Sequence, residues 1–177
     1  MWGYILIGIA AVILLFGIIV SIQPPLFRIV RSATMAATPE TVFEQVNDFQ
    51  NWYEWSPWAK IDPAMKQTYD GPSSGAGAKY AWDGNKQVGA GRMTITDCQP
   101  PSKIGILLEF LRPFATTNVV QFTFRPEGSQ TNVEWSMEGK KNFISKAFCL
   151  FFNMDKVVGA DFEKGLAQMK AIVENRG

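Results

Sequence analysis

The chain has 177 residues, and its 17 Lys and Arg are nearly balanced by 16 Asp and Glu, which gives a formal net charge of +1. The basic residues form no long run, so the sequence lacks the concentrated positive face that phosphate binding requires, and we expect no nucleic-acid partner. There is no histidine, and neither Cys98 nor Cys149 has the neighbours of a metal site, so we expect no metal or other cofactor.

The first segment of the chain is predicted to cross a membrane. Residues 2–22 are apolar apart from Tyr4 and Ser21, and this run is long enough to span a hydrocarbon core about 30 Å thick. A secretory signal peptide is the alternative. However, the segment has no positively charged start, a longer apolar stretch than signal peptides usually have, and no clear cleavage site. We therefore predict that residues 1–25 form an uncleaved transmembrane anchor.

The charges that flank this span predict its orientation. Arg28 and Arg31 follow it closely, whereas no charged side chain precedes it, and an excess of basic residues usually marks the cytoplasmic side. We predict a single-pass membrane protein whose folded domain, residues 26–177, lies in the cytoplasm with its cysteines reduced. About 150 residues are sufficient for one domain with a sizeable core.

The domain begins with signals for a strand and then for a short helix. Residues 26–37 have the composition of a strand. In the segment "TPETVFEQVNDF" that follows, Thr38 is a suitable N-cap, Pro39 suits the first helical position, and Glu40 favours the positive end of a helix. Apolar side chains then recur at helical spacing, so we predict a helix with one apolar face.

From Pro63 onward the hydrophobic pattern changes to a period of two residues and keeps it for about 75 residues. Turn sequences rich in Gly and Pro interrupt the pattern at spacings near ten residues, which predicts six consecutive antiparallel strands with one apolar and one polar face. The predicted apolar face consists of Tyr80, Trp82, Met93, Ile95, Ile106, Leu108, Phe110, Val120, Phe122, Phe124, Val133, Trp135 and Met137.

The last predicted element is a long amphipathic helix in "DKVVGADFEKGLAQMKAIVE". Its apolar residues, from Val158 to Val173, fall on one face of a helical wheel. Asp155 is predicted to cap this helix or to pair with its dipole. Gly159 and Gly165 border the apolar stripe although each costs roughly 1 kcal/mol relative to alanine, so we expect them to permit close packing or to leave space beside the helix.

This order of elements resembles the START-like, helix-grip superfamily (SRPBCC), and within it the polyketide cyclase/dehydrase-like branch, in the subset preceded by a membrane span. The resemblance covers residues from about 26 to 175. It rests on "ATPETVFEQVNDFQNWYEWSPW", "GAGAKYAWDGN" with "VGAGRMTI", "TNVEWSMEG" and "MDKVVGADFEKGLAQMK". It implies an α+β fold with two short helices after the first strand. A curved antiparallel sheet of about seven strands then wraps around the C-terminal helix and leaves a cavity between them.

In such a fold the aromatic cluster "NWYEWSPWAK" lies at the rim of the cavity. Proline pushes the preceding residue out of the helical region, so Ser56-Pro57 ends any helix here. Large apolar side chains are needed to hold helices of one or two turns in place. We predict that Trp52 serves this packing role and that Trp55 and Trp58 lie at the cavity entrance, although packing alone would also explain all three.

The apolar faces of the strands and of the last helix supply the other candidate ligand contacts. Ligand pockets are mostly apolar with a few polar groups, and the candidates for those are the Tyr80 hydroxyl, the Trp82 indole, Asn118 and Arg112. The complete set of predicted ligand-binding residues is Trp55, Trp58, Tyr80, Trp82, Met93, Phe110, Phe122, Trp135, Met137, Phe162 and Leu166.

These features predict a membrane-anchored module that binds a hydrophobic small molecule or a lipid. Two alternatives stay open: an enzyme that acts on a polyketide-like or aromatic substrate by acid-base assistance, and a protein-interaction scaffold whose own side chains fill the cavity. The sequence has no recognisable nucleophile motif or phosphate-binding loop. Its candidate acids and bases, Asp62, Asp83 and Glu109, fit solvated turns or the polar outer face better than a catalytic site.

Overall fold

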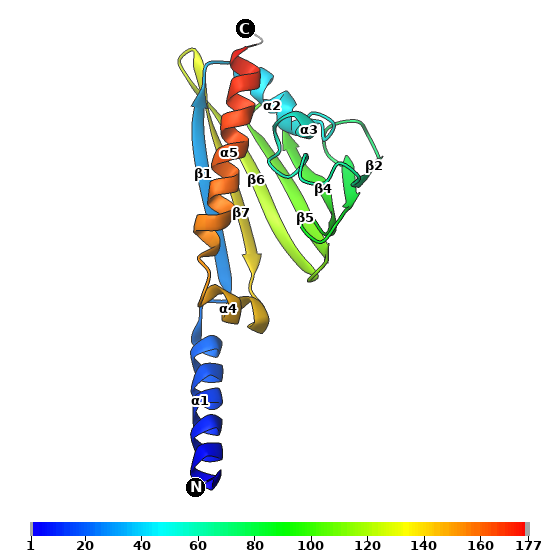
Figure 1. Ribbon diagram of the computed structural model, residues 1–177. Coiled ribbons are helices and arrows are strands. Elements are labelled where there is room, and N and C mark those ends of the chain that lie inside the picture. Colours follow the sequence, from blue (N-terminus) through cyan, green and yellow to red (C-terminus); the bar gives the residue numbers. More distant parts are fainter. Residues whose placement is uncertain (1, 176–177) are drawn as a thin grey trace.

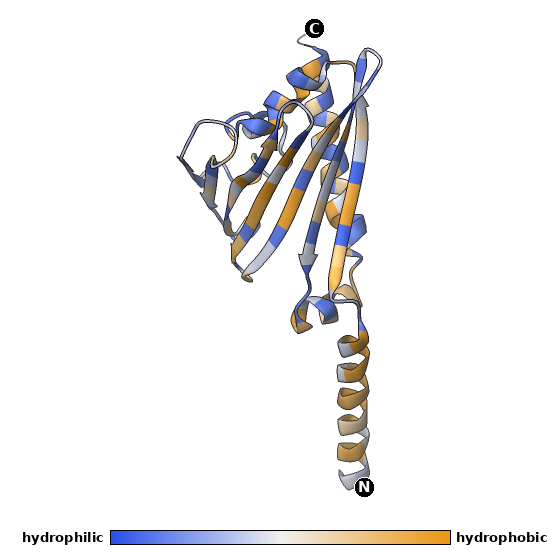
Figure 2. Ribbon diagram, turned by 180° about the vertical axis from the view of Figure 1, so that it is seen from behind, coloured by the Kyte–Doolittle hydropathy of each residue, from blue (hydrophilic) through white to orange (hydrophobic). Residues whose placement is uncertain are grey.

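The computed structural model describes residues 2–175, in which a long helix, α1 (Trp2–Ile22), projects away from a folded domain (Figure 1). The helix occupies the residues predicted for it. Its surface is apolar along most of its length and almost entirely exposed (Figure 2). With 21 residues it is about 32 Å long, which matches the thickness of a bilayer core.

Seven strands form one antiparallel sheet in the order β1-β7-β6-β5-β4-β3-β2, so that each strand from β2 to β7 pairs with the next and β1 adds at the β7 edge. The predicted meander is therefore confirmed. Register shifts in β4, at Ala90/Gly91 and between Ile95 and Asp97, are irregularities of the kind that bend a sheet. The strands are β1 (Leu26–Met35), β2 (Lys66–Asp70), β3 (Lys79–Asp83), β4 (Ala90–Gln99), β5 (Lys103–Arg112), β6 (Thr116–Glu127) and β7 (Gln130–Lys140).

Helices α2 (Pro39–Asn47), α3 (Trp52–Trp55) and α5 (Met154–Glu174) lie on one face of this sheet (Figure 1). Thr38 caps α2 as predicted, because its side chain accepts a hydrogen bond from the backbone N–H of Thr41 at 3.4 Å. The two short helices and the long C-terminal helix complete the predicted helix-grip architecture.

A further short helix, α4 (Phe143–Cys149), connects β7 to α5 and was not predicted from the sequence. Its side chains show no buried apolar face, so the periodicity that reveals amphipathic helices is missing. It lies between the domain and the end of α1, where the Lys146 ammonium donates a hydrogen bond to the Ser21 carbonyl at 3.1 Å. It therefore occupies the junction between the domain and α1 (Figure 1).

Helix α5 runs along β1 and β7, and its two glycines allow a close approach. A Cβ atom on Gly165 would lie 2.9 Å from the Trp135 ring and 3.2 Å from the Pro57 ring. Next to it, the rings of Trp135 and Phe162 stack with centroids 3.9 Å apart and an interplanar angle of 5°. The predicted packing role of the glycines is confirmed here, because Gly165 leaves the space that the Trp135 and Pro57 rings occupy.

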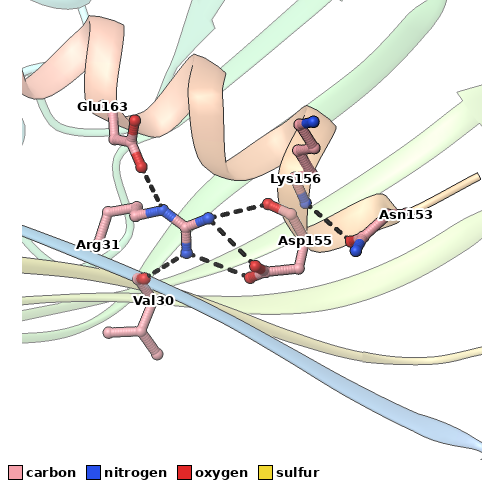
Figure 3. Close-up of polar contacts among 6 residues, drawn as sticks. All are labelled: Val30, Arg31, Asn153, Asp155, Lys156 and Glu163. Atoms are coloured by element: carbon pink, nitrogen blue, oxygen red, sulfur yellow. Dashed lines mark hydrogen bonds and ion pairs between the residues drawn. The ribbon is translucent and has the colours of Figure 1, made fainter.

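Gly159 makes room for Arg31, which crosses from β1 to the first turns of α5 (Figure 3). The guanidinium bonds both carboxylate oxygens of Asp155 at 3.2 Å and one oxygen of Glu163 at 2.7 Å. These hydrogen bonds, that to Asp155 first, raise the pKa of Arg31. Of the two roles predicted for Asp155, the structure shows the second: Asn153 is the N-cap and accepts from the Lys156 N–H at 3.0 Å, whereas Asp155 lies in the first turn, where an acidic residue pairs with the helix dipole, and also holds Arg31.

Candidate functional site

A cavity of about 400 Å³ lies between α3, α5 and the sheet. Its volume is within the range of small-molecule sites, roughly 300–1,000 Å³. The cavity exists because α5 covers mainly the β1 and β7 side of the sheet, whereas the faces of β3, β4 and β5 are covered only by short segments. Of the predicted ligand-binding residues, the structure places eight in the cavity wall: Trp58, Tyr80, Trp82, Met93, Phe110, Trp135, Met137 and Phe162.

Three predicted residues lie in the solid core and not in the cavity wall. Trp55, Phe122 and Leu166 are at most 1% exposed. The rings of Trp55 and Phe122 meet edge to face at 6.2 Å, and both pack against Trp135. These three side chains belong to a second, fully buried layer, and the rings of Trp55 and Phe122 pack against the wall residue Trp135.

Trp52 packs in the core as predicted, but Trp52 rather than the expected Trp55 forms part of the cavity wall. Trp55 is fully buried, whereas Trp52 lines the cavity. Both indoles are positioned by the end of α2, whose last carbonyl groups have no partner within the helix. The Trp52 indole N–H donates to the Val46 carbonyl at 3.0 Å and the Trp55 indole N–H donates to the Gln45 carbonyl at 2.9 Å.

Other members of the aromatic cluster complete this cap and the cavity wall. The Asn51 amide donates to the Glu44 carbonyl at 2.9 Å, so three consecutive carbonyl groups of α2 receive side-chain donors from residues 51–55. Trp58 lies beyond the cap and packs edge to face on Trp135 and Phe162 at 6.0 and 6.3 Å. The cluster therefore terminates one helix and lines a cavity with its outer members.

Several polar side chains of the cavity wall have no hydrogen-bond partner among residues 2–175, and they include the Asn118 amide, the Tyr80 hydroxyl and the buried indole N–H of Trp135. The Asn118 side chain is almost fully buried, and it lies across β7 at Gly139, where a Cβ atom would collide with it. Burial raises the pKa of the Tyr80 hydroxyl to about 12. Tyr80 is therefore a neutral hydrogen-bond donor at physiological pH and a poor general base.

The other two predicted polar anchors have different roles. The Trp82 indole N–H already donates to the Val88 carbonyl at 3.1 Å, so only the ring of this residue contributes to the wall. Arg112 points to the outside of the domain and pairs with Asp83. Trp82 and Arg112 lie near the same end of β3 and β5, where each has found its partner outside the cavity.

The three candidate carboxylates lie outside the cavity wall. Asp62 is buried, but it accepts backbone hydrogen bonds from Ala64 at 3.0 Å and from Asn85 at 2.7 Å, which fixes two turns. Asp83 pairs with Arg112, as described above. Glu109 forms a bidentate pair with Arg92 at 2.6 and 2.8 Å, and the hydrogen bonds from Arg92 lower the pKa of Glu109.

Several charged residues of the wall were missed by sequence reasoning. Asp161 of α5 and the successive Lys140 and Lys141 line one part of the cavity. On a helical wheel Asp161 falls outside the apolar stripe of α5. Sequence reasoning missed it because a wheel does not show how far a cavity extends around a helix. In the described part of the chain no hydrogen bond joins two titratable side chains of the wall, and no cluster of residues able to hold a metal ion occurs there.

The fold and its cavity define a helix-grip domain with a hollow, largely aromatic interior. Residues 27–174 match the family described as "Polyketide cyclase / dehydrase and lipid transport", and the chain belongs to this family. A search of curated proteins found no significant match.

Solved structures share the fold at low sequence identity. A protein from Chromobacterium violaceum has a TM-score of 0.60 and 16% identity, with 86% of this chain and 99% of that chain covered. A protein of unknown function from Staphylococcus aureus has a TM-score of 0.65 and 11% identity, with 88% and 98% covered. A protein from Mycobacterium smegmatis has a TM-score of 0.59 and 18% identity, with 85% and 92% covered. At these identities the likeness establishes the fold alone.

Proposed function

We propose that the protein is a membrane-anchored binding module that holds a hydrophobic small molecule or a lipid in the cavity between the sheet and α5. The observation that carries this proposal is a cavity of about 400 Å³ walled mainly by aromatic and methionine side chains. Burial of an apolar ligand there contributes about 25 cal/mol per Å² of surface removed from water. The Asn118 amide and the Tyr80 hydroxyl would orient the polar end of the ligand.

The properties of α1 support the anchor. Helix α1 has 21 residues, is apolar apart from Tyr4 and Ser21, and buries almost none of its side chains in the domain. It is therefore not part of the protein core. We propose that residues 1–25 hold the domain, residues 26–177, at the bilayer where hydrophobic ligands partition, with the domain on the cytoplasmic side.

The enzyme alternative lacks an acid-base pair in the described part of the wall. The scaffold alternative requires a filled interior, which the cavity volume does not favour.

Two neighbouring valines of β6 allow a matched test. Val120 is 3% exposed and lines the cavity, whereas Val119 is 57% exposed on the outer face. Full-length wild-type protein and the Val120→Trp and Val119→Trp variants are extracted in mild detergent and analysed by native mass spectrometry for copurifying ligand. Wild type and Val119→Trp should retain the same apolar ligand, and Val120→Trp should lose it.

Circular dichroism spectra and melting temperatures establish that the variants are folded, and Val120→Phe replaces Val120→Trp if the larger ring prevents folding. The binding proposal is abandoned if wild-type protein carries no ligand and takes up none from lipid extracts. It is also abandoned if filling the cavity leaves the bound ligand unchanged.

A further inference from the structure

Exposed apolar side chains gather at one end of the domain. The register pairs Leu26 with Lys140 and Phe110 with Thr116, so the start of β1, the end of β7 and the β5–β6 turn all lie at this end. Helix α4 and its loop lie there too (Figure 1). The apolar collar, as we define it, consists of Phe114, Phe143, Ile144, Phe148, Phe151 and Phe152, each more than half exposed.

The opposite end of the domain has a different surface. Its turns, residues 99–102 and 127–130, contain Gln, Pro, Ser, Glu and Gly, and none of the large apolar side chains that are exposed between residues 2 and 175 lies in either turn. Exposed apolar clusters of this kind usually mark an interaction surface. The asymmetry shows that the collar is a property of one end of the domain and not of its surface in general.

Contacts between the collar and α1 place the collar relative to the anchor. Phe151 stacks on Phe16 of α1 with ring centroids 6.5 Å apart. Phe16 lies six residues before the end of α1, which corresponds to about 9 Å along the helix axis. If α1 spans the bilayer, Phe151 therefore lies at the depth of about 5–10 Å that the apolar faces of interfacial helices reach.

Charge and cavity position point to the same partner. Lys140, Lys141 and Lys146 lie beside the collar, and none of them pairs with a carboxylate among the described residues. Basic residues at this level attract anionic headgroups, each contributing about 1 kcal/mol near an anionic surface. Lys140, Lys141 and Ser145 of α4 also line the cavity, so the cavity extends to the collar.

We propose that the collar inserts into the headgroup region of an anionic bilayer and that the cavity receives its ligand there, laterally from the membrane. The ligand class that fits is an amphiphile with one acyl chain, for the apolar cavity, and an anionic head, for Lys140 and Lys141. This inference rests on the proposed function, because it requires α1 to be a membrane anchor. It adds the side from which the ligand enters and the residues that contact the bilayer.

Depth measurements on the full chain test the inference. Cys98 and Cys149 are replaced by serine, and single cysteines are introduced by Ile144→Cys in the collar and by Ser129→Cys in the far turn. A third variant, Ile13→Cys, reports on the middle of α1. Each is labelled with a small environment-sensitive fluorophore and reconstituted into liposomes of phosphatidylcholine and phosphatidylglycerol that contain spin-labelled lipids.

The expected result is strong quenching at position 144 by lipids labelled near the headgroup, quenching at position 13 by lipids labelled deep in the chain, and none at position 129. Quenching at position 13 but not at position 144 overturns the collar inference and leaves the anchor intact. No quenching at position 13 overturns both. Fluorescence transfer between copies at position 144 without lipid quenching shows a contact between two chains and also overturns the inference.

A rate measurement tests the entry route. Phe148 and Phe152 stack on each other at 4.3 Å and are exposed, so replacing both with serine removes apolar contact from the collar without opening the core. Uptake of a pyrene-labelled fatty acid from anionic liposomes should slow at least fivefold in this variant. Binding of the same probe from detergent solution should be unchanged, and Val119→Ser serves as the control. Equal uptake rates from liposomes overturn lateral entry.

Discussion

The contact between α5 and the sheet leads to a prediction that opposes helix propensity. In the Gly165→Ala variant the new Cβ atom would lie 2.9 Å from Trp135 and 3.2 Å from Pro57. The Trp135 ring stacks on Phe162 at 3.9 Å and on Phe122 at 4.9 Å, so any shift of this ring disturbs both contacts. Overpacking of this kind costs about 1–3 kcal/mol. The gain in helix propensity is about 1 kcal/mol, so we expect a net loss of stability of about 1 kcal/mol.

An exposed position of the same helix provides the control. Ala167 faces solvent, so Ala167→Gly should lower the free energy of unfolding by about 1 kcal/mol through helix propensity alone. Propensity alone predicts opposite signs for the two variants, whereas our reasoning predicts a loss in both. Chemical denaturation of the full chain in detergent, followed by tryptophan fluorescence and circular dichroism, measures the two free energies. An increase in stability for Gly165→Ala would refute the close packing of α5 on the sheet.

Three further predictions concern single side chains. Arg31→Met should lower the melting temperature, because Asp155 and Glu163 lose their partner, and the difference should shrink at high salt since all three side chains are partly exposed. Tyr80 has a pKa of about 12 in the folded state, above its ordinary value of 10, so the folded protein retains this proton longer than the unfolded chain. Wild-type stability should therefore fall between pH 10 and 12, and urea titrations should show a smaller fall for Tyr80→Phe. Asn118→Leu should preserve folding and weaken a ligand with a polar head roughly two- to tenfold in a fluorescence titration, the effect of one lost hydrogen bond.

The parts of the fold that the sequence predicts are those with a local signal. Thr38 and Pro39 mark the start of α2, and period-two patterns reveal the strands, because an apolar face must alternate along a strand that is buried on one side. The long apolar stripe likewise predicts α5 to within a turn. Each of these signals lies within a few residues of the structure that it specifies.

The parts that the sequence does not predict depend on contacts between distant residues. The spacing of Trp52 and Trp55 is compatible with either one facing the cavity, and the choice depends on which carbonyl group at the end of α2 each indole reaches. The sequence indicated that Asp155 lies at the N-terminus of α5 but not that Asn153 is the cap or that Asp155 pairs with Arg31, which is 124 positions away in the sequence. Helix α4 has no buried face, so hydrophobic periodicity could not indicate it, and its remaining local signal is the N-cap Asn142.

The hollow interior follows from how α5 is held. Arg31 ties its first turns to β1, and close packing at Gly165 brings its middle against Trp135 of β7, so the helix stays over one side of the sheet. The faces of β3, β4 and β5 are then left to the short helices α2 and α3 and to the segment around Trp58. Such short segments lack the side chains to fill the space above three strands, and a cavity remains. The cavity wall includes Met154 and Val158 at the start of α5, so the contacts that hold α5 over one side of the sheet also let the cavity extend toward the end of the domain that carries α1.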